Sequence, residues 1–178
     1  MSTKHLLRAA LVAAGLVTIP SIAAAQDMAN GTLTVTATVE SSIALTFENE
    51  TGGVALTGAG TNAATMALGA ISAYNTVSTP GVTRTVSGSD FTVSSPFAVR
   101  VVKANSASAS YKLDASLASA DASNSWRINA TALTTANATL GSAYTYGSAV
   151  AHTVYLTVPF SASTGAISKV VNFTATAN

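Results

Sequence analysis

The sequence contains no cysteine, so neither a disulfide nor a thiolate metal site can form. Charge is also scarce, because eight basic and seven acidic residues make up only 8% of the chain. Without a basic patch, we expect no binding to nucleic acid or to an anionic membrane surface. The folded chain must therefore be held together by packing, by backbone hydrogen bonds or by association with other chains.

Catalytic and metal-binding patterns are missing as well. Beyond residue 25 the chain has a single histidine, His152, on the apolar face of an expected strand, where a core or sheet-edge role is favoured over a ligand. There is no Gly-x-Ser-x-Gly turn and no glycine-rich phosphate loop, and the acidic residues are scattered. We therefore expect no enzymatic activity, no catalytic residue, no cofactor and no metal.

Residues 1–25 have the three parts of a signal peptide. Two basic residues stand near the start, residues 11–17 are apolar, and three alanines at 23–25 provide a cleavage site. Pro20 and its polar neighbours interrupt the apolar stretch, which is too short for a transmembrane helix. We expect a bacterial protein that is exported to the periplasm, the cell surface or the medium, with no membrane span after cleavage.

The expected mature chain begins with a strictly alternating run over residues 32–39. Threonine occupies every even position. The odd positions hold Leu33, Val35, Ala37 and Val39. This alternation predicts a β-strand with one apolar and one polar face. Such a strand can pair within the sheet of its own chain or add to the sheet of a neighbouring chain, and the sequence leaves both possibilities open.

Further alternating runs, separated by turn residues, continue to the C-terminus. They predict one all-β sandwich domain over residues 26–178, with about eight strands. Beyond the first run, strands are expected near residues 43–47, 54–57, 64–72, 82–86, 91–93, 97–102, 111–117, 126–128, 150–160 and 167–177. The runs at 97–102 and 111–117 are expected to form a hairpin, and the last two runs a second antiparallel pair.

Three aromatic residues suggest a sugar-binding surface. Trp126, Tyr144 and Tyr146 would form a stacking platform if they lay exposed together, and the two tyrosines share a strand face because they are two residues apart. The alternative, which we favour, is that these rings pack in the core or across a sheet. A self-contained extracellular binding module for carbohydrate is therefore the second functional hypothesis.

The run from Thr32 to Glu40, followed by Ile43-Ala44-Leu45, resembles the mature start of bacterial fimbrial subunits. It is most similar to the cysteine-free pilins of the colonisation-factor type, in the alternate chaperone–usher class, and spore-coat-U-like secreted proteins look related. In that family each subunit is an incomplete immunoglobulin-like antiparallel sandwich, which a neighbour's N-terminal segment completes by β-strand addition.

The resemblance implies a structural role in a pilus used for cell adhesion. It also implies self-association, with a periplasmic chaperone and an usher as assembly partners. The groove-filling side chains would be Leu33, Val35, Ala37 and Val39.

Overall fold

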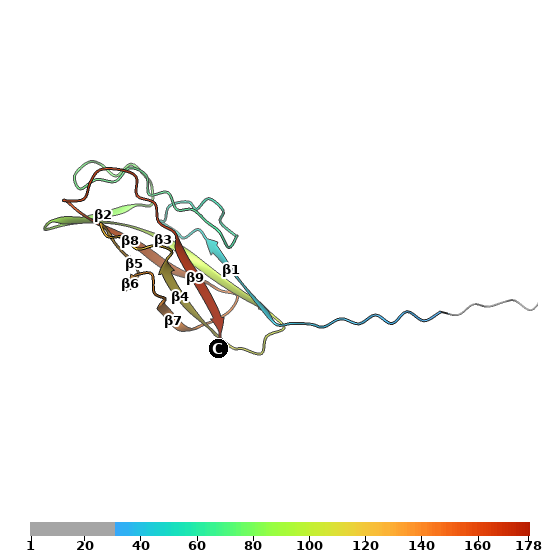
Figure 1. The fold of residues 1–178 in the computed structure, drawn as a ribbon. Coiled ribbons are helices and arrows are strands. Elements are labelled where there is room, and N and C mark those ends of the chain that lie inside the picture. Colours follow the sequence, from blue (N-terminus) through green and yellow to red (C-terminus); the bar gives the residue numbers. More distant parts are fainter. Residues whose placement is uncertain (1–30) are drawn as a thin grey trace, which may run out of the picture. The chain divides into compact units, whose positions relative to one another are not determined.

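The computed structural model describes residues 31–178, so the expected signal peptide, residues 1–25, lies outside the described residues. In the described range the chain is all-β, with nine strands in two antiparallel sheets (Figure 1). The expected all-β class is confirmed, and the two sheets are consistent with a β-sandwich. Within this range there is also no helix that is long and apolar enough to cross a membrane.

The larger sheet contains six strands in the order β1–β3–β8–β5–β6, with β2 also paired to β3. Its strands are β1 (Ser42–Glu48), β2 (Thr83–Ser87), β3 (Asp90–Ala104), β5 (Ser125–Ile128), β6 (Thr131–Leu133) and β8 (Ala149–Pro159). The long strand β3 pairs with β8 on one side, and with β2 and then β1 on the other. The outer side of β1 is therefore an edge of this sheet.

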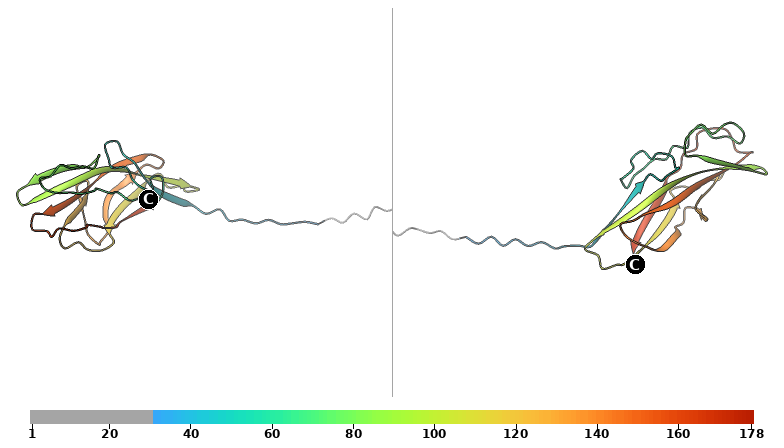
Figure 2. Two further views of the ribbon diagram at one scale, coloured as in Figure 1. Left: turned by 90° about the horizontal axis from the view of Figure 1, so that it is seen from above. Right: turned by 180° about the vertical axis from the view of Figure 1, so that it is seen from behind.

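The smaller sheet contains only three strands in the order β7–β4–β9. They are β4 (Tyr111–Leu117), β7 (Ala138–Tyr144) and β9 (Val171–Ala177). The pairing of β4 with β9 is continuous, whereas the pairing of β4 with β7 contains register shifts. The last strand of the chain, β9, is thus an edge strand on its outer side (Figure 2).

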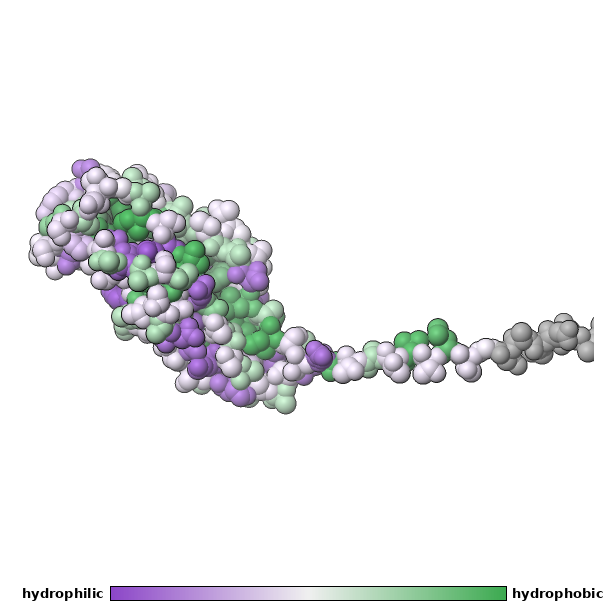
Figure 3. All heavy atoms as spheres, in the orientation of Figure 1, coloured by the Kyte–Doolittle hydropathy of each residue, from purple (hydrophilic) through white to green (hydrophobic). Residues whose placement is uncertain are grey.

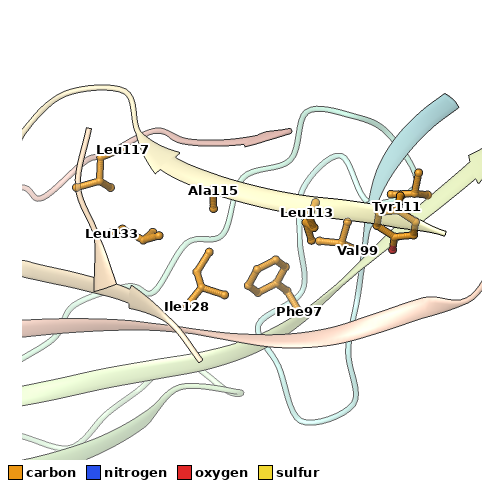
Figure 4. Close-up of a cluster of buried hydrophobic side chains, with 9 residues drawn as sticks. Phe97, Val99, Tyr111, Leu113, Ala115, Leu117, Ile128 and Leu133 are labelled. Atoms are coloured by element: carbon orange, nitrogen blue, oxygen red, sulfur yellow. The ribbon is translucent and has the colours of Figure 1, made fainter. Parts of the chain in front are cut away.

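The core lies between the two sheets and follows the alternation of β3 and β4 (Figure 4). On β3, Val99 and Val101 are completely buried, and on β4 so are Tyr111 and Leu113. Strands of alternating pattern place every second side chain on the same face, so two such strands from opposite sheets supply a continuous apolar layer. This layer holds the sheets together without any disulfide.

Both predicted hairpins are wrong. β3 and β4 follow one another in sequence but belong to different sheets, and the same is true of β8 and β9. Each connecting loop crosses from one sheet to the other, because the apolar face of every strand must be covered by the opposite sheet. Alternation identifies where strands are, but it does not identify which strand each one pairs with.

Several strand predictions also differ from the structure. Residues 54–57 and 64–72 form loops joined by a single bridge between Thr57 and Thr65. Glycines with positive φ, at Gly58, Gly60 and Gly69, interrupt the extended backbone there. Conversely, β6 and β7 were not expected, because their short, small-residue sequences carry little apolar alternation.

Candidate functional site

A large, mostly apolar groove lies between the edge strands of the two sheets, β1 and β9, and the loops over residues 60–71 and 165–170 also line it. Its volume is about 1660 Å³, and its floor includes the core residues Phe97, Ile128 and Leu156. Ile43 and Leu45 of β1 form one wall, and Val171 and Phe173 of β9 form the other. Apolar residues accordingly gather between these two strands in Figure 3. We call this feature the β1–β9 groove.

The groove carries little charge. Of the residues that line it, Lys169 is the one with a formal charge. Its ammonium group donates instead to the carbonyl oxygen of Ala120, at 2.7 Å. A groove with mostly apolar walls and a single charged residue favours an apolar occupant, because a charged occupant would lose its hydration at the apolar walls.

The backbone of β9 offers unused hydrogen-bonding groups to the groove. At its two ends, the carbonyl oxygen of Val170 accepts from the N–H of Ala118, and the N–H of Asn178 donates to the carbonyl oxygen of Ser110. Backbone groups alternate in direction along an antiparallel strand, so the even-numbered residues of β9 face β4. The odd-numbered residues therefore present their N–H and C=O groups to the open edge. These residues are Val171, Phe173, Ala175 and Ala177.

The edge of β1 is only partly open. The N–H of Phe47 donates to the carbonyl oxygen of Thr61 at 2.8 Å, and the carbonyl oxygen of Phe47 accepts from the N–H of Gly60 at 2.7 Å. The loop after β1 therefore occupies the edge at Phe47. By the same alternation, Ile43 and Leu45 keep their outward backbone groups free of β3. Of the two edges, β9 offers the longer row of groups for pairing.

Three phenylalanine rings narrow the groove near its middle. The ring of Phe173 lies 5.1 Å from that of Phe47 and 5.8 Å from that of Phe97, both edge to face. Phe47 and Phe97 are 6.5 Å apart. We call Phe47, Phe97 and Phe173 the phenyl triad. Because three large side chains already fill this level, any segment in the groove must present a small side chain there.

The alternating run near the N-terminus is not a strand in the structure. Residues 31–41, which we call the N-terminal segment, belong to no strand, and their side chains are exposed. Leu33, Val35 and Val39 are 88%, 80% and 75% exposed, and Ala37 is exposed too. Alternation alone cannot make a strand, because an extended backbone needs a neighbour for its hydrogen bonds. The four apolar residues therefore form an unpartnered strand sequence.

The three aromatic residues considered for sugar stacking are divided between two places. Tyr144 and Tyr146 both pack on Tyr111, with ring centroids 5.5 and 5.2 Å away. Trp126 lies on β5 in the other sheet, where its Nε1 donates to Asp121 at 2.8 Å. All three side chains are partly buried against the core. The carbohydrate hypothesis stays a prediction, with its rings in two groups rather than on one platform.

The carboxylate that holds Trp126 is itself well supported. Burial alone would raise the pKa of Asp121, but hydrogen bonds from Trp126, Asn124 and the backbone of residues 123 and 124 outweigh it and hold this pKa at about 2. Asp121 thus stays ionised and orders the loop before β5. Its role in the structure is to cap this loop and to fix the indole ring.

The single histidine of the described chain is a core residue. His152 is only 2% exposed and lies between the rings of Phe97 and Tyr144. Its Nδ1 pairs with the side-chain amide of Asn129 at 3.1 Å. Burial lowers its pKa below the ordinary value, which favours the neutral ring. Among the described residues, no group of three His, Asp or Glu side chains is arranged to hold a metal ion.

No family model, curated protein or solved structure matches this chain.

The alternating segment was recognisable from the sequence, whereas the groove was not. The apolar positions of the N-terminal segment were identifiable from alternation alone. The β1–β9 groove was not, because it exists only where two edge strands from different sheets come to face one another.

Proposed function

We propose that this protein is an exported structural subunit of a pilus-like surface polymer, which assembles by β-strand addition through its N-terminal segment. Its domain is then an immunoglobulin-like sandwich that lacks one strand. The observation that carries the proposal is that one chain holds both an open apolar groove with an unpaired strand edge and an exposed, unpartnered strand sequence.

The two features complete one another physically. The groove lacks a strand with apolar side chains at alternate positions, and the N-terminal segment has such a sequence. Insertion would pair the outward backbone groups of β9 and cover the apolar walls. A buried valine or leucine side chain contributes roughly 1.5–3 kcal/mol, so Leu33, Val35 and Val39 supply a substantial driving force.

Addition between copies is favoured over insertion into the chain's own groove. To fold back beside β1, the N-terminal segment would have to turn at Glu40 and Ser41, directly before β1 begins at Ser42. Two-residue hairpin turns require positive φ and therefore favour glycine or asparagine. A segment on one copy and a groove on the next make a head-to-tail contact, which generates open filaments rather than closed dimers.

The proposal also defines partners and compartment. An unfilled groove beside an unpaired strand edge invites uncontrolled pairing, so a subunit of this kind needs protection until it is assembled. A periplasmic chaperone and an outer-membrane usher would provide that protection for an exported bacterial chain. The role is structural, in cell adhesion, and requires no catalysis.

The test is the size of the expected mature chain, residues 26–178, measured by light scattering over a range of concentrations. We expect oligomers that grow with concentration. Val35→Asp should keep the chain monomeric, because it would place a charge in an apolar groove. The matched control is Thr34→Asp, which changes the opposite face of the same segment and should still assemble.

Two outcomes contradict the proposal. One is a parent chain that remains monomeric at every concentration. The other is equal assembly by the Val35→Asp chain, since this shows that the apolar face of the N-terminal segment takes no part in association. Circular dichroism of each variant confirms that the domain itself is still folded.

A further inference from the structure

We infer that the N-terminal segment of one copy adds antiparallel to β9 of the next in a single register, with Ala37 opposite Phe173. This inference rests on the proposed function and adds to it the position of every donor residue. The phenyl triad makes Ala37, the smallest of the four apolar residues, the one that determines the register.

The direction of the added N-terminal segment relative to β9 follows from the strand pairing within the two sheets. Every strand pair in the described part of the chain is antiparallel, and β9 is already antiparallel to β4. A donor added in the same sense continues this hydrogen-bonding pattern across the smaller sheet. Because β1 and β9 run in opposite directions across the groove (Figure 1), the donor would run parallel to β1.

The alternation of odd- and even-numbered residues along each strand limits the possible registers. The odd residues of β9 turn their backbone groups to the open edge, and Val171, Phe173 and Ala175 also pack their side chains against the core. A donor must likewise point its apolar side chains inward, and these are its odd residues. Odd residues of the donor therefore stand opposite odd residues of β9. Neighbouring registers differ by two residues, because a shift of one exposes the apolar face.

The sizes of the side chains then select one register. With Ala37 opposite Phe173, each large residue of one strand meets a smaller or equal residue of the other. The four inward pairs are Leu33 with Ala177, Val35 with Ala175, Ala37 with Phe173 and Val39 with Val171. These four pairs span β9 from its first residue to its last.

Either neighbouring register is worse. A shift in one direction puts Val35 opposite Phe173 and Val39 opposite Lys169, beyond the start of β9. A shift in the other direction puts Val39 opposite Phe173 and leaves Leu33 beyond Ala177, the last residue of β9. Both shifts place a β-branched side chain at the phenyl triad, where packing leaves room for a small one.

The absence of cysteine allows a direct test by disulfide trapping. In the inferred register Thr36 lies opposite Thr174, and both side chains are exposed on the outer face. The pair is of the non-hydrogen-bonded kind, whose Cα atoms are about 4.5 Å apart, within the range that a disulfide spans. The double variant Thr36→Cys/Thr174→Cys is made in residues 26–178. Thr34→Cys/Thr174→Cys and Thr38→Cys/Thr174→Cys are the matched controls for the two neighbouring registers.

After mild oxidation, non-reducing electrophoresis should show a ladder of linked copies for the Thr36/Thr174 pair and little linkage for either control. A ladder from a control pair overturns the register but leaves assembly standing. A link within single copies overturns the addition between copies. If no pair links and light scattering finds only monomers, the proposed function fails together with the register.

Enlarging Ala37 gives an independent readout, because this residue is exposed in the single copy and its change leaves the domain intact. We expect Ala37→Leu to raise the concentration needed for assembly by about tenfold or more, since it overpacks the phenyl triad. Thr34→Leu is the control, because it enlarges a side chain on the outward face of the same segment and should assemble like the parent. Equal assembly by both variants overturns the placement of Ala37 at the triad.

Discussion

At the scale of single residues, the molecule depends on how a few polar groups are accommodated in a core without disulfides. His152 is the clearest case, because it is buried beside Phe97 and Tyr144 and pairs with Asn129 through one ring nitrogen. In the described part of the chain, its Nε2 has no hydrogen-bond partner. A neutral ring can be buried in this way at little cost, whereas a protonated ring would bury a charge without a partner for Nε2.

This burial predicts a pH-dependent stability. The pKa of His152 is lowered in the folded state, whereas its value in the unfolded chain is near 6.5. Below that pH the unfolded chain therefore binds a proton at His152 that the folded chain does not bind. The free energy of unfolding should therefore fall as pH drops from 7.5 to 5.5, by up to about 1.4 kcal/mol per pH unit. Urea unfolding at a series of pH values measures this slope.

The comparison is the variant His152→Gln, which keeps a polar side chain but cannot be protonated in this range. Its unfolding free energy should be nearly independent of pH between 7.5 and 5.5, whatever its absolute value. The same slope in the variant and in the parent would mean that another group is responsible, and would falsify this role for His152.

At the scale of secondary structure elements, the two edge strands of the groove are not equivalent. The loop residues Gly60 and Thr61 satisfy the outer edge of β1 at Phe47, whereas β9 keeps its outward groups at every odd position. β9 is thus hydrogen-bonded on one side only, although its side chains already contribute to the core. An edge of this kind has backbone groups free to pair with another strand, which is the role that we propose for β9.

Proline substitutions at two adjacent residues test the two hydrogen-bonding edges of β9 independently. Ala175→Pro removes an N–H that faces the open edge, so the domain should remain folded while assembly is lost. Thr174→Pro removes an N–H that faces β4 instead, and should lower the free energy of unfolding by about 1–3 kcal/mol because a buried carbonyl loses its partner. Urea unfolding and light scattering of both variants measure these effects.

A result that contradicts this view would be an Ala175→Pro chain that assembles like the parent. Strand addition would then have to use β1, or association would have to use another surface. Equal destabilisation by the two prolines would show that both N–H groups serve the existing sheet.

At the scale of the whole molecule, the proposed assembly would cover the groove, so that a single copy and an assembled copy should be distinguishable in solution. A dye that becomes fluorescent on apolar surface, such as ANS, should bind the monomeric Val35→Asp variant and should bind the assembled parent much less. The difference in bound dye per copy should correspond to roughly the surface of one groove. A synthetic peptide of residues 30–40 should reduce the fluorescence of the monomeric variant. The same peptide with Val35 replaced by aspartate is the control.

The sequence by itself determined the all-β class, the position of most strands and the alternating N-terminal segment. These features depend on local patterns: side chains of a strand alternate between faces, and glycine and polar turns interrupt the runs. Val99 and Leu113 were identifiable as inward-facing because each lies at the correct position of an alternating run. The same reasoning predicted a core or sheet-edge position for His152, and the structure places it in the core.

The tertiary structure decided which strands pair and where the groove lies. The runs that form β3 and β4 predict a hairpin, yet they lie in opposite sheets, because pairing depends on contacts between residues far apart in sequence. The phenyl triad brings together residues of three different strands, and no local pattern links Phe47 to Phe173. The segment that we propose fills the groove is recognisable from its local alternating pattern. The groove itself forms only when the six-stranded sheet and the three-stranded sheet face one another.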